Sequence, residues 1–193
     1  MQDAGRAVVT VSAEQQAGIA QALRDVGRSK AQRGGLLPED PLVALIVELH
    51  MIAALNAEEF SPDHLALIAS HGLFWLEQAL TANSSSGSYG AVQALDALLM
   101  LYEQEVIALS ALTPVVPHVI EQAERHGPDW QEWMPCSFLV SVADGLVRSG
   151  EPELLPSGER AFALAERFAD GLTKDERKMI VQEIKHARKR LRA

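Results

Sequence analysis

Apolar side chains recur every three or four residues along most of the chain, a spacing typical of helices that bury one face. The clearest run alternates between the two spacings and consists of Val92, Leu95, Leu99, Tyr102, Val106 and Leu109. No segment sustains a period of two, and only residues 7–11 (AVVTV) have the composition of a strand. The pattern therefore predicts an all-α fold.

Helix starts are indicated by residues that can cap free backbone N–H groups, either as a capping box or directly before a proline. Such residues are Ser12, Asp40, Ser61, Thr113 and Thr173. Clusters of Gly, Ser and Pro predict two long connections, at residues 83–90 and 149–158. The first of these is expected to be a flexible loop between two antiparallel helices.

These signals together predict about eight helices, paired as antiparallel hairpins in a compact bundle. Residues 42–55 are mostly apolar and are expected to form its central helix. A short α-solenoid of the HEAT type is the alternative, because four hairpins would repeat at a similar interval. All 193 residues are expected to form a single domain, in which residues 1–11 are a candidate disordered segment and residues 173–193 a basic terminal helix.

Charge is distributed unevenly over the chain, whose formal net charge is −9. No lysine or arginine stands between Gly34 and Glu124, whereas twelve acidic residues do: Glu39, Asp40, Glu48, Glu58, Glu59, Asp63, Glu77, Asp96, Glu103, Glu105, Glu121 and Glu124. Residues 173–193 reverse the sign, with eight bases against three acids. Each region can steer a partner of opposite charge.

The acidic region favours a non-enzymatic helical module that binds a basic partner protein, in an inhibitory, immunity or chaperone-like role. The acidic residues expected to contact that partner are Glu58, Glu59, Asp63, Glu77, Asp96 and Glu103. Trp130 and Trp133 are candidate aromatic contacts, since tryptophan is frequent at binding hot spots. The competing interpretations are an ordinary solvated acidic surface and tryptophans that cover the core.

The basic terminal helix supports a second hypothesis, a nucleic-acid-associated subunit. Its candidate phosphate contacts are Lys185, Arg188, Lys189 and Arg192. Alternatively, these bases can pair with acidic residues of the same chain.

The sequence gives little indication of a catalytic or metal-binding site. His50, His64 and His71 are the candidate metal ligands, but the chain has no HExxH motif and only one ExxH, Glu183–His186. The single cysteine, Cys136, precedes apolar residues and is interpreted as a small buried side chain. We therefore expect no catalytic residue, metal or cofactor, and the sequence favours a protein that is not an enzyme.

The expected location is the cytoplasm. A chain with one cysteine cannot form an internal disulfide, which fits a reducing compartment. The longest apolar run is too short for a membrane span, and the N-terminal residues lack the pattern of a secretory signal. No membrane association is expected.

Overall fold

The computed structural model describes residues 46, 49–50, 53, 60–130 and 133–191, and within them it contains only helices. The all-α prediction is therefore confirmed for this part of the chain. The α-helices are α3 (Pro62–Ala82), α4 (Ser85–Glu103), α5 (Val116–His126), α6 (Trp133–Arg148), α7 (Leu155–Ala169) and α8 (Lys174–Arg190). Two 3₁₀ turns, η3 (Leu109–Ala111) and η4 (Gly127–Asp129), flank α5. The two helices expected before residue 60, and with them the count of eight, lie largely outside the described residues.

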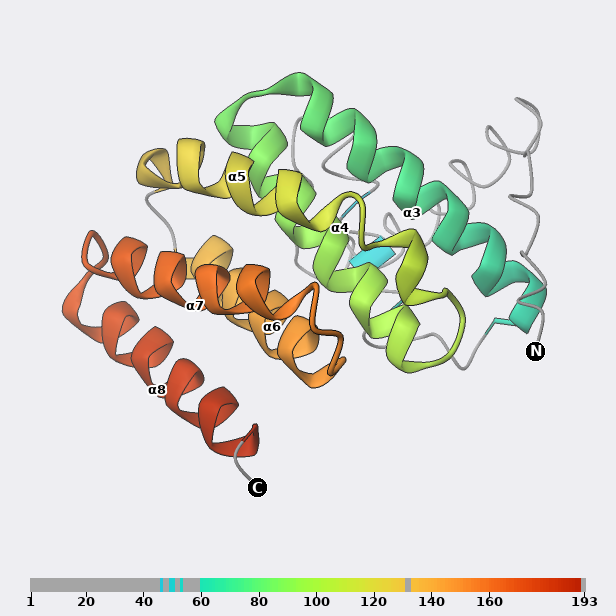
Figure 1. The fold of residues 1–193 in the computed structure, drawn as a ribbon. Helices are drawn as coiled ribbons and strands as arrows, with labels where there is room; N and C mark the ends of the chain where they lie inside the picture. Colours follow the sequence, from blue (N-terminus) through green and yellow to red (C-terminus); the bar gives the residue numbers. More distant parts are fainter. Residues whose placement is uncertain (1–45, 47–48, 51–52, 54–59, 131–132, 192–193) are drawn as a thin grey trace.

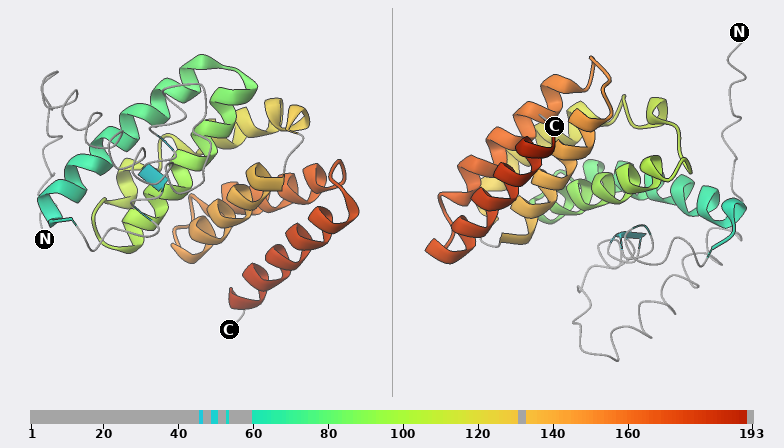
Figure 2. Two further views of the ribbon diagram at one scale, coloured as in Figure 1. Left: turned by 180° about the vertical axis from the view of Figure 1, so that it is seen from behind. Right: turned by 90° about the horizontal axis from the view of Figure 1, so that it is seen from below.

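The described helices are arranged between α3 at one edge of the molecule and α8 at the opposite edge (Figure 1). α3 and α4 lie side by side in opposite directions, and α4 also contacts α5 and α6. α6 then packs against α7 and α8. In all views α3 and α8 occupy opposite edges of the described structure (Figures 1 and 2).

α4 is the most extensively buried helix among those described. Its buried residues form an almost unbroken run from Gly87 to Leu99, followed by Leu101. The central position had been expected for residues 42–55. Most of that segment lies outside the described residues, although Ile46, Leu49 and Ala53 are buried in the same core as α4.

The predicted loop at residues 83–90 is wrong except for its first two residues. α4 begins at Ser85, and the hydroxyl of Ser84 caps it by accepting a hydrogen bond from the N–H of Gly87 at 3.0 Å. Gly87 is buried, and a Cβ there would lie 2.6 Å from the carbonyl oxygen of Ala79 in α3. The small residues allow the two helices to approach closely, and they do not mark a flexible segment.

The second predicted connection is also shorter than expected, because α7 begins at Leu155. Gly158 is buried in its first turn, where a Cβ would lie 2.7 Å from Cγ2 of Val147 in α6. The long helix expected through Leu109 instead ends at Glu103, and Glu105 takes a left-handed backbone conformation with φ 61°.

Of two other predicted helix starts, the one at Thr113 is wrong and the one at Thr173 is confirmed. Thr113 does not cap α5, which begins at Val116 without a side-chain cap, because the Thr113 hydroxyl donates to the carbonyl of Leu109. The capping box of Thr173 and Glu176 is confirmed at the start of α8.

Candidate functional site

The acidic candidates in α4 do not form an open acidic face. Asp96 is only 2% exposed, and its Oδ2 lies 2.7 Å from Nε2 of His50. Glu103 is exposed but forms an ion pair with Arg148 of α6 at 2.5 Å. The prediction that Asp96 contacts a partner is therefore wrong, because it lies on the buried side of α4 and is already paired.

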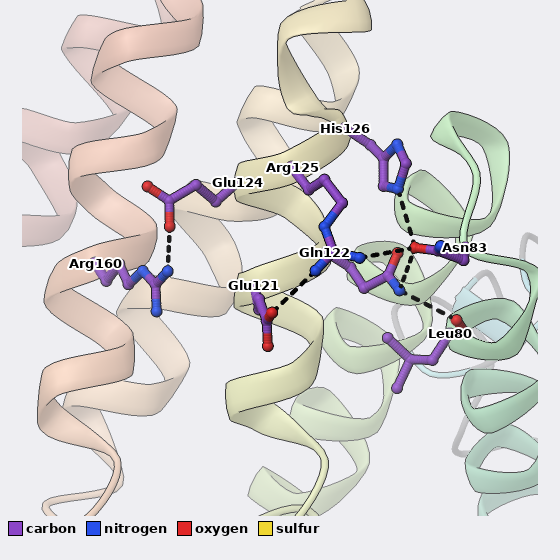
Figure 3. Close-up of polar contacts among 8 residues, drawn as sticks. All are labelled: Leu80, Asn83, Glu121, Gln122, Glu124, Arg125, His126 and Arg160. Carbon is purple, nitrogen blue, oxygen red and sulfur yellow. Dashed lines mark hydrogen bonds and ion pairs between the residues drawn. The ribbon is translucent and has the colours of Figure 1, made fainter.

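The acidic residues of α5 are also paired within the chain (Figure 3). Glu121 accepts a hydrogen bond from Arg125 at 3.0 Å. Glu124 is paired with Arg160 of α7, and this hydrogen bond lowers the pKa of the Glu124 carboxyl. These carboxylates are consequently engaged by bases of the same molecule.

Asn83 joins the α3–α4 turn to α5 (Figure 3). Its backbone is left-handed, with φ 42°, and its side-chain oxygen faces α5. That oxygen accepts hydrogen bonds from Gln122 at 3.1 Å and Arg125 at 3.1 Å, and lies 3.3 Å from Nε2 of His126. The cluster holds helices together, and its oxygen acceptor is fully used by the protein itself.

Exposed acidic side chains lie on the outer face of α3. We define this face as the outward row of Asp63, Leu67, Ser70, Phe74, Glu77, Gln78 and Thr81, which share one side of the helix at intervals of three and four. Asp63 and Glu77 are exposed and pair with no base among the described residues. Glu58 and Glu59 lie outside the described residues.

An exposed aromatic ring lies within this face. Phe74 is 45% exposed, the largest value among the exposed large apolar side chains of the described residues. It stands one turn before Glu77 and one turn after Ser70 on the same side of the helix. The sequence pattern does not single out Phe74, because its neighbour Trp75, which is buried, makes the pair resemble core residues.

The structure separates the two candidate tryptophans. Trp130 is partly buried, donates its ring N–H to the carbonyl of Ser85 at 3.3 Å and packs edge-on against Phe168. Trp133, at the start of α6, is 38% exposed. Trp130 therefore has a structural role, whereas Trp133 remains accessible to a partner.

The bases of α8 divide into two groups. The arginines pair with acids of neighbouring helices: Arg177 with Asp170 at 2.8 Å, Arg188 with Glu166 at 3.0 Å and Arg190 with Asp144 at 2.9 Å. Lys185 and Lys189 are exposed and pair with no acid among the described residues. The self-pairing alternative thus describes the arginines, Arg188 among the candidates, and Arg192 lies outside the described residues.

Sequence reasoning missed two further lysines on this helix. Lys174 and Lys178 are exposed and share one side with Lys185 and Lys189. Their separations of four, seven and four residues were a readable signal, because each brings the next lysine back to the same side of a helix.

The histidines do not assemble into a metal centre in the part of the chain that the structure describes, where no three His, Cys, Asp or Glu residues are placed to hold an ion. His50 is bonded to Asp96, and His71 is buried beside Trp75. His64 lies in α3.

Cys136 is buried in α6, and this burial, together with the negative charge of Glu183, raises the pKa of its thiol to about 11. Such a thiol is poorly suited to nucleophilic catalysis, because little thiolate forms near neutral pH.

Among the described helices none has the length and apolar character required to cross a membrane. Comparisons with protein-family models, curated proteins and solved structures found no match to this chain. Its function must therefore be argued from its own surfaces.

Proposed function

We propose that the protein is a non-enzymatic helical interaction module that binds a basic partner protein through the outer face of α3, in an inhibitory, immunity or chaperone-like role. The observation that carries this proposal is the exposed ring of Phe74 beside the carboxylate of Glu77, which pairs with no base among the described residues. In a reducing compartment such as the cytoplasm, the single buried Cys136 would remain a thiol.

The chemistry of this face suits an arginine or lysine of a partner. A cation can lie over the face of an aromatic ring while it pairs with a nearby carboxylate, and each contact contributes about 0.5–1 kcal/mol at an exposed site. An aromatic side chain that becomes buried on binding also supplies the apolar centre that most interfaces require.

The surrounding charge favours the same partner. Residues 34–124 contain no lysine or arginine, so α3 and α4 present no positive side chain that would repel a basic protein. Glu105, which follows the end of α4, is exposed and adds further negative charge to this part of the chain. The complementary field speeds association more than it tightens the complex.

The test compares capture of proteins from a lysate of the source cells by the full chain and by two variants. Phe74→Ala with Glu77→Gln should lose the captured basic protein, and raising the salt from about 50 to 500 mM should release it from the parent chain. The matched control is Met179→Ala with Glu159→Gln, which removes an exposed apolar side chain and one exposed carboxylate from other helices. Identical capture by both variants, or capture that ignores salt, would overturn the proposal.

A further inference from the structure

We infer that α8 is a second interaction surface, which binds the phosphate backbone of double-stranded nucleic acid without sequence preference. The surface is the lysine row, defined as Lys174, Lys178, Lys185 and Lys189. It lies at the edge of the described structure opposite to α3 (Figures 1 and 2). The inference is independent of the function proposed for α3.

The lysine row is straight and narrow. At 3.6 residues per turn, its four side chains fall within about 60° of the circumference of α8, and the row extends about 22 Å along the helix axis. The opposite side of the helix holds Ile180, Ile184 and Ala187, which are buried against the body. The row therefore points outward, and packing of the apolar side holds it in place.

Ion pairs of the arginines leave the lysines available. Arg188 binds Glu166 of α7, Arg177 binds Asp170 directly after α7, and Arg190 binds Asp144 of α6. Each arginine thus neutralises a carboxylate beside α8. No ion pair of the described residues contains a lysine of α8. The positive charge of the outward side is thus not cancelled by the neighbouring helices.

The acids of α8 itself lie mostly away from the row. Glu176 is bonded to Thr173 in the capping box. Glu183 is half-buried and close enough to Cys136 to raise the pKa of that thiol, which places it toward α6. Asp175 is exposed in the first turn, where a carboxylate favours the helix dipole.

A phosphate backbone matches this surface better than a folded protein or a lipid bilayer does. Flexible lysines are point charges that pair with phosphates but distinguish no bases. The row contains no aromatic side chain or arginine to anchor a protein interface. The apolar side of α8 is buried in the fold, and it cannot enter a bilayer as an amphipathic helix would.

The net charge of −9 does not oppose a local site at this position. Screening at physiological salt limits the interaction of exposed charges to about 8 Å, and the exposed acids of α3 lie across the molecule from α8. A duplex bound along α8 would lie close to the lysines. The repulsion between its phosphates and the acids of α3 would be screened by the salt in solution.

The experiment measures fluorescence anisotropy of a labelled 20-base-pair DNA duplex of random sequence, titrated with the full chain at several salt concentrations. We expect binding at about 50 mM salt that weakens steeply as salt rises, with a slope of log K against log salt of about −3 to −4, because four phosphates would be neutralised. A second duplex of unrelated sequence should bind within about twofold. Lys185→Gln with Lys189→Gln should weaken binding at least tenfold and reduce the slope by about 2.

A control variant distinguishes the effect of losing the lysine row from the effect of changing the net charge of the protein. Arg160→Gln with Arg167→Gln makes the same change in net charge on α7, where both arginines pair with Glu124, and should leave duplex binding within about twofold. The inference is wrong if no duplex binding occurs at 50 mM salt or if the two variants lose binding equally. It is also wrong if the lysines support binding only to anionic vesicles, or only to a second copy of the chain as measured by sedimentation.

Discussion

At the residue level, the imidazole of His71 connects the stability of α3 to pH. The side chain is buried beside Trp75, and its Nε2 has no hydrogen-bond partner among the described residues. Burial disfavours the charged ring and lowers the pKa of His71 below its ordinary value of 6.5. Folding therefore opposes protonation of this histidine.

The free energy of unfolding should therefore decrease as the pH is lowered toward and below the ordinary pKa of histidine. Below about pH 6.5 the unfolded chain binds a proton at His71 that the folded chain resists, so the free energy of unfolding decreases by at most about 1.4 kcal/mol per pH unit. Urea unfolding of His71→Leu between pH 7.5 and 5 should show a flatter pH dependence than the parent. His118→Gln, at an exposed position of α5, is the control and should retain the parent slope. Parallel curves for all three proteins would contradict this account.

The junction of α3 and α4 depends on one small residue. A Cβ at Gly87 would lie 2.6 Å from the Ala79 carbonyl oxygen and 3.0 Å from Cβ of Ala82, so the helices would have to separate. Gly87→Ala should lower the free energy of unfolding by about 1–2 kcal/mol, even though alanine favours helix formation. Ser86→Ala changes an exposed neighbour in the same turn and should shift stability by less than about 0.5 kcal/mol in the same urea titration. A stabilised Gly87→Ala would show that the helices do not approach so closely.

At the level of elements, a buried carboxylate fastens α8 to α6. Asp144 is 5% exposed, and its Oδ2 accepts hydrogen bonds from Arg148 at 3.1 Å and from Arg190 of α8 at 2.9 Å. Asp170 binds another arginine of α8, but both partners of that pair are largely exposed. The two acids thus make similar bonds to α8 in different surroundings.

Removal of the two carboxylates should therefore have unequal effects. Asp144→Ala should destabilise the protein by about 1.5–3 kcal/mol, because hydrogen bonds to a buried charge are lost, and amide hydrogen exchange in α8 should accelerate. Asp170→Ala should cost less than about 1 kcal/mol, as exposed ion pairs contribute little. Equal effects would mean that the burial of Asp144 does not matter to the attachment of α8.

The sequence predicted those elements whose signals are local. The capping box of Thr173 and Glu176 and the apolar positions of α8 depend on residues within the same helix, and both are observed. The first turns of α4 and α7 were predicted as loops because they contain Gly87 and Gly158. These glycines are needed where another helix approaches closely, and no local sequence pattern indicates such a contact. The burial of Asp96 was missed for the same reason, and the sequence left open whether Arg188 pairs within the chain, since each depends on a partner distant in sequence.

At the level of the whole molecule, the order of the helices separates the charges. α3 packs against α4, α4 packs against α6, and α6 packs against α7 and α8. This order places the exposed acids of α3 at one edge of the described structure and the lysine row at the other (Figure 1). Between them, acids and bases are paired across helices, as in Glu103 with Arg148 and Glu124 with Arg160. The two proposed surfaces are therefore far enough apart for two partners to bind at the same time.

The position of the lysine row also determines how the protein attaches to a solid support. Four of the five lysines in the sequence belong to this row, and the fifth is Lys30. Reagents that couple to side-chain amines would consequently link the molecule to a sensor chip or bead mainly through α8, leaving the outer face of α3 directed toward the solution. Covalent immobilisation would thus block one proposed surface and display the other, so each binding measurement needs its own mode of attachment.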